Sequence, residues 1–426
     1  MKLRLFHIAL VLCLTSSTAF ANTDINGLFD ARSTAMGATG VAFIDSAAAI
    51  PINPAALDQI DKLALTLDAT VIVSQPQRVY IVTHPVMGGG GGTYQNYETI
   101  RFDRSTATLP FLGAAYRVHE RIVVGAGVYP LVGSGTTNRY RPAPELQPEL
   151  EVRNESRTGL VEVGVPVSVR ILENLSLAAM WRATYLTTSS TSPLSSPYIY
   201  TEGAPGPSYA TTDVNGWNFG GFELGVLYRP LPALRLGLTY RSKVVVEGTG
   251  KLGVPGMEFD VTSAPFTNPH GFRFGAAVSA LDDRLLLAAD FKYLLYGEAF
   301  KTIDTTFIMN GVEMTRTTKT NWENAFSVHL GAEYAVLPLL RVRGGYSLVQ
   351  SATPKAYADA RYAPPGFSHA FTLGVGVNVL KSLSVDLAGV YIAYQTRVEE
   401  KTPNNSGPGL YGSNAAQIAA SATLRL

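Results

Sequence analysis

The chain has 426 residues, of which 46% are hydrophobic and 16% charged, with 34 basic residues against 33 acidic ones. This composition excludes an intrinsically disordered chain, and the balanced charge excludes a strongly basic nucleic-acid-binding protein. Charged residues are scarcer than the roughly 25% of an ordinary soluble domain, and the 40 glycines exceed the usual share of about 7%. No apolar run after the first twenty residues is long enough for a transmembrane helix, which excludes a helical membrane protein.

The first 21 residues have the pattern of a secretory signal peptide. Lys2 and Arg4 form a positive end, an apolar stretch follows over residues 5–14, and residues 19–21 provide a small-x-small cleavage site. An apolar stretch of about ten residues is too short to span a bilayer. The one cysteine of the sequence, Cys13, lies in this segment, so a mature chain without disulfides, thiolate metal sites or a cysteine nucleophile is expected.

Residues 22–61 form a second segment, in which small residues are frequent and strand periodicity is missing. Glycines at positions 27, 37 and 40 interrupt it, and a run of alanine, isoleucine and proline follows over residues 47–57. About forty residues of this composition are too apolar for an exposed tail. The segment is therefore expected to be buried inside the fold formed by the rest of the chain.

Residues 62–426 alternate between apolar and polar residues, which is the periodicity of β-strands. In one example Leu383, Val385 and Leu387 share a face, and Ser384 and Asp386 share the other. Many of these segments reach the length of about nine to eleven residues that a tilted strand needs to cross a bilayer, whereas soluble strands mostly have about five or six. Tyrosines at segment ends match the aromatic girdles of an outer-membrane barrel: they are Tyr240, Tyr293, Tyr334 and Tyr391.

Short and long connections alternate along this region. Six tight turns and seven long links define fourteen strands, an even number, as in bacterial outer-membrane barrels with short periplasmic turns and long external loops. Residues 418–426 alternate up to Leu426 and form the expected closing strand. The predicted fold class is an all-β, antiparallel transmembrane β-barrel. The tight turns lie near 119–120, 172–174, 230–232, 282–283, 336–338 and 380–382, and the long links near 84–104, 134–156, 190–216, 250–267, 300–320, 350–367 and 398–412.

Residues 31–40, Asp45 and the tripeptide Asn53-Pro54-Ala55 resemble the N-terminal hatch of the FadL/TodX family of outer-membrane transporters. The rest of the chain is also similar to this family and in the same order, over residues 124–130, 222–230, 235–244, 321–323, 330–334, 343–346 and 383–388. A barrel of fourteen strands without a plug would leave an aqueous channel, so the buried segment is expected inside the barrel.

The resemblance implies a monomeric barrel in the bacterial outer membrane, with a signal peptide over residues 1–21, a hatch over 22–61 and the barrel over 62–426. It also implies passive uptake of long-chain fatty acids or other hydrophobic compounds, including aromatic hydrocarbons. The ligand would be caught by extracellular loops, pass to an internal pocket, and leave by hatch movement or a lateral opening. Outer-membrane lipid, lipopolysaccharide and the barrel-assembly machinery are the expected partners, and nucleic acid is not.

Three sets of residues are candidates for the site. The first is the hatch motif, where Pro54 favours an extended Asn53 whose side chain can bond to local backbone; the alternative is a plain turn before the first strand. The second is Leu146 and Leu150 in a proline-containing external loop, which is either a ligand landing site or a stiffened surface loop. The third is a set of cations that alternation places on the inward face, where they could grip a carboxylate or pair with inward carboxylates: they are Arg235, Arg241, Lys243, Arg273, Lys292, Arg341 and Arg343.

Catalysis, metal binding and cofactor binding have little support in the sequence. A lipid hydrolase would need a serine and a histidine, and the nearest match to a nucleophile elbow, residues 366–370, ends in alanine and begins a strand. The histidines do not have metal-ligand spacing. A structural or secretion-associated barrel and an open porin remain as alternatives to the transporter.

Overall fold

The computed structural model describes residues 29–74, 77–82, 97–140, 151–193, 208–358, 363–400, 402, 409–412 and 414–426. The expected signal peptide over residues 1–21 lies outside the described residues, and so do Leu146 and Leu150 of the expected landing loop. Among the helices of the described part, none is long and apolar enough to span a membrane.

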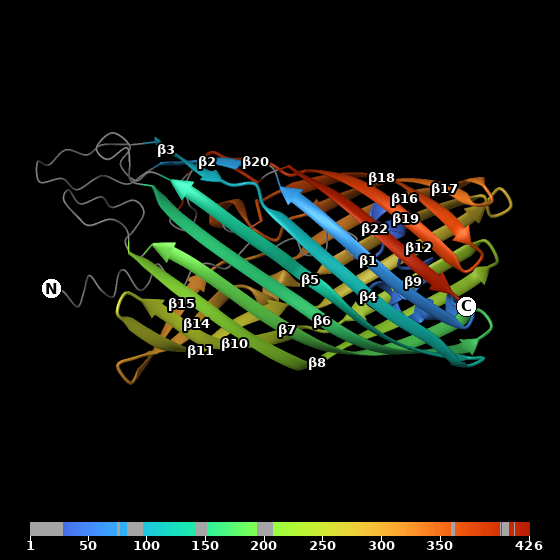
Figure 1. The fold of residues 1–426 in the computed structure, drawn as a ribbon, viewed down its shortest axis with the longest axis horizontal. Helices are drawn as coiled ribbons and strands as arrows, with labels where there is room; N and C mark the ends of the chain where they lie inside the picture. Colours follow the sequence, from blue (N-terminus) through green and yellow to red (C-terminus); the bar gives the residue numbers. More distant parts are fainter. Residues whose placement is uncertain are drawn as a thin grey trace, which may run out of the picture.

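The wall of the molecule is a closed antiparallel barrel of fourteen strands (Figure 1). The barrel closes where the last strand pairs with the first, from Ala64 opposite Arg425 to Ser74 opposite Ala415. This arrangement confirms the predicted fold class. In order around the wall, the strands are β1 (Leu63–Ser74), β4 (Thr106–His119), β5 (Ile122–Tyr140), β6 (Val152–Leu172), β7 (Leu175–Pro193), β8 (Tyr209–Leu231), β9 (Leu234–Arg241), β12 (Gly271–Ala280), β13 (Leu285–Leu294), β16 (Ala325–Leu337), β17 (Leu340–Gln350), β18 (Phe367–Leu380), β19 (Leu383–Ala393) and β22 (Ala415–Arg425).

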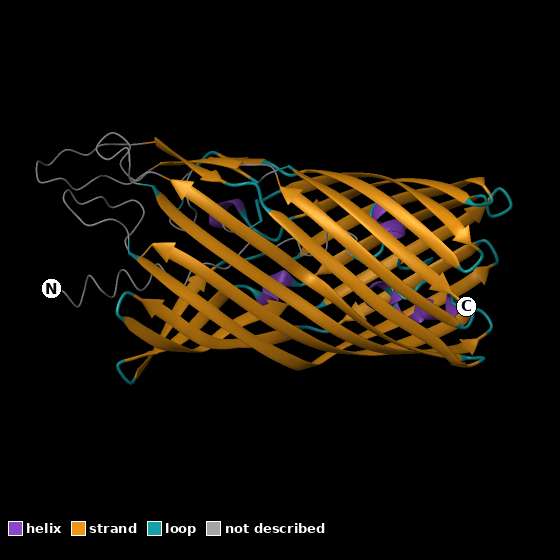
Figure 2. Ribbon diagram, in the orientation of Figure 1, coloured by secondary structure: helices purple, strands orange, loops and turns teal. Residues whose placement is uncertain are grey.

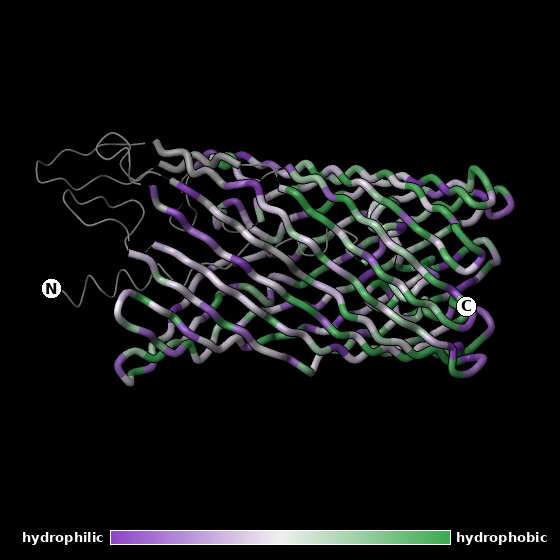
Figure 3. The backbone as a smooth tube through the Cα atoms, in the orientation of Figure 1, coloured by the Kyte–Doolittle hydropathy of each residue, from purple (hydrophilic) through white to green (hydrophobic). Residues whose placement is uncertain are grey.

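The alternation in the sequence becomes an alternation of burial along these strands. In β19 every second residue is exposed, and the exposed set includes Leu387 and Tyr391, while Asp386 on the opposite face is buried. Large apolar side chains therefore cover the outside of the wall, as a lipid-facing surface requires. Figure 3 shows that apolar residues are most frequent along the part of the wall nearer the tight turns, the end at which the C-terminus lies.

At the other end, the wall extends into additional strands where long irregular links are expected from the sequence. The link over 250–267 is a hairpin of β10 (Val244–Val254) and β11 (Met257–Asn268), and the link over 300–320 is a second hairpin of β14 (Thr302–Met309) and β15 (Val312–Lys319). β5 and β6 likewise continue as paired strands through parts of 134–156. The remaining short strands are β2 (Gln77–Val82), β3 (Tyr97–Phe102), β20 (Thr396–Val398) and β21 (Gly409–Tyr411).

The segment that precedes β1 enters the barrel and forms short helices there, which Figure 2 shows within the wall. They are α2 (Ala31–Ala35), α3 (Ala49–Ile52) and the 3₁₀-helix η1 (Pro54–Gln59). Asp30 caps α2 by accepting a bond from the Ser33 N–H, and Asn53 caps η1. Two further short helices, α4 (Tyr296–Ala299) and η2 (Lys355–Tyr357), lie in links far from the tight turns.

Candidate functional site

The internal segment, defined here as residues 29–61, packs against strands around much of the wall. α2 contacts β17, β18, β19 and β22, α3 contacts β5 and β6, and η1 contacts β5 to β8. Ala35, Val41, Ile50 and Leu57 are completely buried. The largest apolar cluster of the protein contains residues of this segment together with inward residues of the wall, so the two share one core.

Asn53 joins three parts of the structure through its side chain, which is fully buried. Its amide nitrogen donates to Val41 O at 2.7 Å and to Val226 O of β8 at 3.0 Å, and its amide oxygen accepts from the Ala55 N–H at 3.1 Å. Gly225 of β8 makes room for this contact, since a Cβ built there would lie 3.0 Å from Ala55 N. Asn53 therefore does more than form a local turn, because it also ties the internal segment to the wall.

Replacing Asn53 with aspartate is expected to lower the free energy of unfolding by about 1–3 kcal/mol, because the buried Val41 carbonyl and the half-buried Val226 carbonyl lose this donor. Aspartate keeps the oxygen that accepts from Ala55 N–H, so the change isolates the donor role. Urea unfolding of the refolded barrel measures the effect. The matched control is Gln59→Glu, which removes the bond from the half-buried Gln59 to Ile44 O; an equal loss in both variants would contradict a special role for Asn53.

Two glycines of the wall form a flat patch on which the backbone of the internal segment rests. Gly331 of β16 and Gly345 of β17 are ladder partners. A Cβ built on Gly331 would lie 2.7 Å from Cβ of Met36, and a Cβ on Gly345 would overlap the backbone of Met36 and Gly37. A larger residue at either position is therefore incompatible with the docked segment.

Asp58 is held by three arginines from three different strands. Its carboxylate lies 3.4 Å from Arg117 of β4, 2.8 Å from Arg170 of β6 and 2.7 Å from Arg229 of β8, and it accepts a 2.7 Å bond from Ser176 Oγ of β7. Only 1% of its side chain is exposed. We call these five residues the Asp58 clamp; they fix the C-terminal end of the internal segment to four strands of the wall, β4, β6, β7 and β8.

A second ionic network holds the N-terminal part of the segment. Arg32 of α2 lies 3.1 Å from Asp45 and 2.9 Å from Glu333 of β16. Glu333 also pairs with Arg343 of β17, which reaches Asp386 of β19 at 2.7 Å. Arg343, a candidate ligand contact from the sequence, is therefore paired with carboxylates of the wall.

A third charged cluster is buried inside the barrel, on the inward faces of β5 to β9. Glu162 pairs with Arg241 at 2.6 Å and with Arg182 at 3.5 Å, and it accepts a 2.7 Å bond from the Tyr129 hydroxyl. Arg241 also lies 3.5 Å from Glu223. Arg241, another candidate ligand contact, thus has two carboxylate partners.

The other candidate cations have three different environments. Arg273 is buried and donates to the carbonyls of residues 51–52, at 2.7 and 3.2 Å, and Lys292 is buried on β13. Arg341 lies 3.7 Å from Glu333 and is 40% exposed. Lys243 differs from the prediction: it lies in the two-residue link between β9 and β10 and is exposed, because the alternation breaks at Ser242, which is buried next to the buried Arg241.

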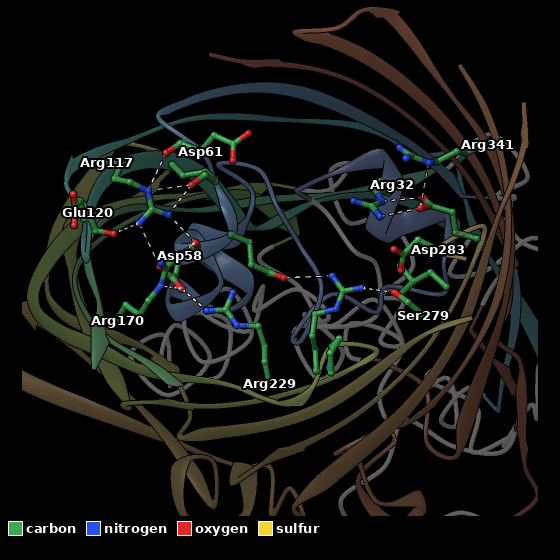
Figure 4. Close-up of a pocket in the computed structure, with 16 residues that line it drawn as sticks. Arg32, Asp58, Asp61, Arg117, Glu120, Arg170, Arg229, Ser279, Asp283 and Arg341 are labelled. Atoms are coloured by element: carbon green, nitrogen blue, oxygen red, sulfur yellow. Dashed lines mark hydrogen bonds and ion pairs between the residues drawn. The ribbon is translucent and has the colours of Figure 1, made fainter. Parts of the chain in front are cut away.

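A cavity of about 750 Å³ lies between the internal segment and the tight-turn end of the wall (Figure 4). It is lined mainly by charged side chains, including the arginines of the Asp58 clamp and Arg32. Arg235 of β9 also lines it, donating to Ser279 Oγ at 2.8 Å and to Gln59 Oε1 at 3.4 Å. Within the part of the chain that the structure describes, Arg235 has no carboxylate at ion-pair distance.

The serine and histidine considered for hydrolysis do not form a catalytic pair. Ser368 is buried and His369 is exposed, since adjacent residues of β18 point to opposite faces. His369 instead lies 2.7 Å from the Tyr346 hydroxyl. Among the described residues, groups of three or more His, Cys, Asp or Glu that could hold a metal ion do not occur.

The Asp58 clamp is the largest feature that was not identified from the sequence. Its arginines stand near the tight-turn ends of β4, β6 and β8, at equivalent places in successive hairpins. That repeated placement is a signal in the sequence, but its partner lies far away in the chain, in the internal segment. Alternation alone does not connect the two.

Comparisons with known proteins identify the family. The model of the outer membrane protein transport protein family (OMPP1/FadL/TodX) matches residues 11–425. A Neisseria meningitidis serogroup B protein named as an outer membrane protein, NMB0088, is 22% identical over 423 residues, which cover 90% of this chain and 89% of that protein.

Solved structures with the same fold include a Pseudomonas aeruginosa FadL homologue, with a TM-score of 0.72 at 17% identity, covering 93% of this chain and 98% of that one. The toluene transporter TbuX of Ralstonia pickettii has a TM-score of 0.64 at 19% identity, covering 95% and 99%, and the toluene transporter TodX of P. putida has 0.67 at 17% identity, with the same coverage. The family consists of transport channels and not of enzymes. The chain therefore belongs to the OMPP1/FadL/TodX family of outer membrane transport proteins and is a β-barrel of the bacterial outer membrane.

Proposed function

We propose that this protein takes up hydrophobic small molecules, either long-chain fatty acids or aromatic hydrocarbons, passively across the outer membrane. The observation that carries the proposal is the internal segment, which shares one apolar core with the wall and is held at both ends by ion pairs. An open porin would have a water-filled lumen at this level. Names of structural relatives, among them toluene transporters, support the same substrate class.

In this proposal residues 22–61 form the hatch of a monomeric barrel that is inserted by the barrel-assembly machinery and surrounded by lipid and lipopolysaccharide. Ligand is caught at the loop end, where Leu146 and Leu150 contribute a landing surface. Between the loop end and the hatch lies an apolar region containing Tyr296, Phe300 and Trp322, whose rings contact one another at centroid distances of 4.5 to 5.9 Å.

Release is proposed to occur through the wall between β5 and β6. Their pairing stops after Val124 opposite Val167 and resumes at Gly127 opposite Gly164. Ile50 of the internal segment covers this interruption: Cβ atoms built on Gly127 and Gly164 would lie 3.3 and 3.2 Å from its side chain. A hatch movement that withdraws Ile50 would therefore uncover a gap in the wall, so hatch movement and lateral opening would be one event.

The cations are proposed to serve a ligand that carries a carboxylate. Four of these cations are buried, and any ligand would have to displace their present contacts: they are Arg241, Arg273, Lys292 and Arg343. Arg235 differs, because it faces the cavity at the tight-turn end. Arg341 lines the same cavity but lies beside Glu333, and Lys243 is exposed in the link after β9, so both would act only as weak attractants. Arg235 is accordingly the cation best placed to meet an acidic head group that reaches the hatch.

Uptake by cells with the gene removed and then restored tests the proposal. We expect restored cells to take up radiolabelled oleate or naphthalene faster than cells without the gene, and the compound that responds identifies the substrate class.

A covalent bridge between two cysteines tests the release route. Ala126→Cys and Val165→Cys place them at exposed positions on β5 and β6, on either side of the interruption, and bridging them is expected to stop uptake. Equal uptake of both compounds with and without the gene would overturn the transport function.

A further inference from the structure

The wall has a second interruption, between β8 and the chain that leaves β9. The pairing of β8 with β9 ends at Glu223 opposite Arg241, and pairing with β10 starts at Asn215 opposite Thr249. Between these points, residues 216–222 face residues 242–248 without ladder pairs, and every one of these residues is described. We call this stretch the β8–β10 seam (Figure 1).

Three hydrogen bonds cross the seam, and two of them depend on side chains. The Ser242 N–H donates to Phe222 O at 3.0 Å, and the Phe222 N–H donates to Ser242 Oγ at 2.9 Å. The Asn218 amide donates to Val245 O at 2.7 Å. In a membrane wall, a regular ladder would satisfy all these backbone groups. Opening the seam therefore breaks fewer bonds than opening any fully paired part of the wall.

β8 is also loosened on its other side at the same height. Its register with β7 shifts between Arg182 opposite Gly221 and Thr184 opposite Asn218, which leaves Phe219 and Gly220 without ladder partners on β7. The contact of Phe219 with β7 is instead a side-chain bond, from the Trp181 indole N–H to Phe219 O at 2.7 Å. The Asn218 amide oxygen accepts from the Gly220 N–H at 2.8 Å and stabilises this bulge. A bulge beside an unpaired edge gives β8 freedom to bend outward.

Apolar and aromatic side chains lie on both sides of the seam. Outside, the rings of Trp217 and Phe219 stack with centroids 5.6 Å apart, and their side chains are 51% and 59% exposed. Inside, Val244 and Val246 are buried in the apolar cluster that includes the internal segment. The seam thus connects an exposed aromatic surface with the apolar interior.

The seam lies farther from the tight-turn end than the β5–β6 interruption does. Trp217 is separated from the tight turn after β8 by more than half of that strand. Gly127 lies only a few residues after the tight turn that precedes β5. Tight turns of outer-membrane barrels are periplasmic, so the seam faces the outer part of the membrane. Gly127 lies beside the hatch, whereas the seam lies on the loop side of it.

We propose that the β8–β10 seam is a side entrance through which an uncharged apolar compound passes from the outer part of the membrane into the barrel interior. This inference rests on the proposed transport function and adds an entry route separate from the extracellular loops. Trp217 and Phe219 receive the compound, and Asn218 acts as the closure. A charged compound is excluded, because it would have to shed its water between apolar side chains.

Cysteine bridging tests the entrance. The seam pair is Asn218→Cys with Val245→Cys, joined by a short thiol-reactive crosslinker that a reductant can cleave. The control pair is Ala276→Cys with Ala289→Cys, ladder partners in β12 and β13. Bridging the seam pair is expected to slow uptake of radiolabelled naphthalene about tenfold, because the open state is no longer populated. Reduction should restore uptake, and the control pair should leave it unchanged.

The outcomes separate the two proposals. In one outcome, naphthalene uptake stays undiminished when the seam is bridged and yet is lost when the β5–β6 interruption is bridged. This result overturns the side entrance and leaves the transport function standing. Uptake that does not depend on the protein overturns both. Asn218→Ala provides a second variant without crosslinking: it removes the bond to Val245 O and should raise naphthalene uptake, and an unchanged or lower rate in a correctly folded barrel counts against the seam.

Discussion

Replacing Asp58 with asparagine is expected to free the C-terminal end of the internal segment and to lower the free energy of unfolding by about 3–5 kcal/mol, the usual cost of removing one partner from a buried ion pair. The loss has a clear origin. Arg117, Arg170 and Arg229 are mostly buried around this one carboxylate, with 15%, 27% and 26% of their side chains exposed. Without it, three positive charges would face one another beside the cavity.

Two measurements check this expectation. Urea unfolding of the refolded protein gives the loss of stability, and planar bilayers report whether the freed segment leaves an ion-conducting path. The control is Asp61→Asn, three residues farther along, where the side chain is exposed. A variant at position 58 that unfolds like the native protein and stays electrically silent would show that the clamp does not hold the segment.

The Asp58 clamp should also persist at acidic pH. Burial alone would raise the pKa of Asp58, but hydrogen bonds from Arg170 and Ser176 and the charge of Arg170 outweigh it and hold the pKa below its ordinary value of 3.8. A lowered carboxylate pKa contributes stability that is present above the unfolded pKa and lost as the pH falls through the folded one. The stability difference between native protein and Asp58→Asn should therefore stay constant from neutral pH down to about 4 and shrink only below it.

Strand number and strand direction could be predicted because the information is local. Alternation over a single strand fixes which face meets lipid, as Leu387 and Asp386 of β19 show, and turn spacing counts the strands. The same rule fails where the alternation is interrupted. Unbroken alternation through Ser242 predicts an inward Lys243, whereas the structure has a link between two strands there and Lys243 is exposed.

The interior could be predicted only in part. The hatch motif carried a local signal, since an extended Asn53 before Pro54 caps a helix, yet its bonds to Val41 and Val226 depend on the closed barrel. The Asp58 clamp joins Asp58 to arginines that lie 59 to 171 positions away, so no local pattern contains it. Alternation predicts which cations face inward, but it does not reveal that Arg343 and Arg241 already have carboxylate partners.

Replacing Gly345 with alanine is expected to prevent the internal segment from docking, although it adds a single methyl group. The new Cβ would lie 2.7 Å from Leu330 O and would overlap the backbone of residues 36–37. Backbone on both sides cannot rotate away as a side chain could, so the cost should reach the upper end of the usual overpacking range, about 3 kcal/mol. Loss of docking would also separate the Gly37 carbonyl from His329, whose Nδ1 lies 2.7 Å away.

Gly344→Ala is the matched control, because the same methyl group one residue earlier would meet its nearest atom, Leu373 Cδ2, at an ordinary 3.6 Å. Both variants carry the same glycine-to-alanine change in β17, so the change in backbone propensity is the same. A difference between them therefore reports contact with the internal segment alone. Protease digestion from the periplasmic side and urea unfolding should both distinguish them, with the Gly345 variant cleaved within residues 29–61 and the Gly344 variant protected. Equal protection would mean that the segment can shift on the wall without loss, and that its close contact with Gly345 is not needed for docking.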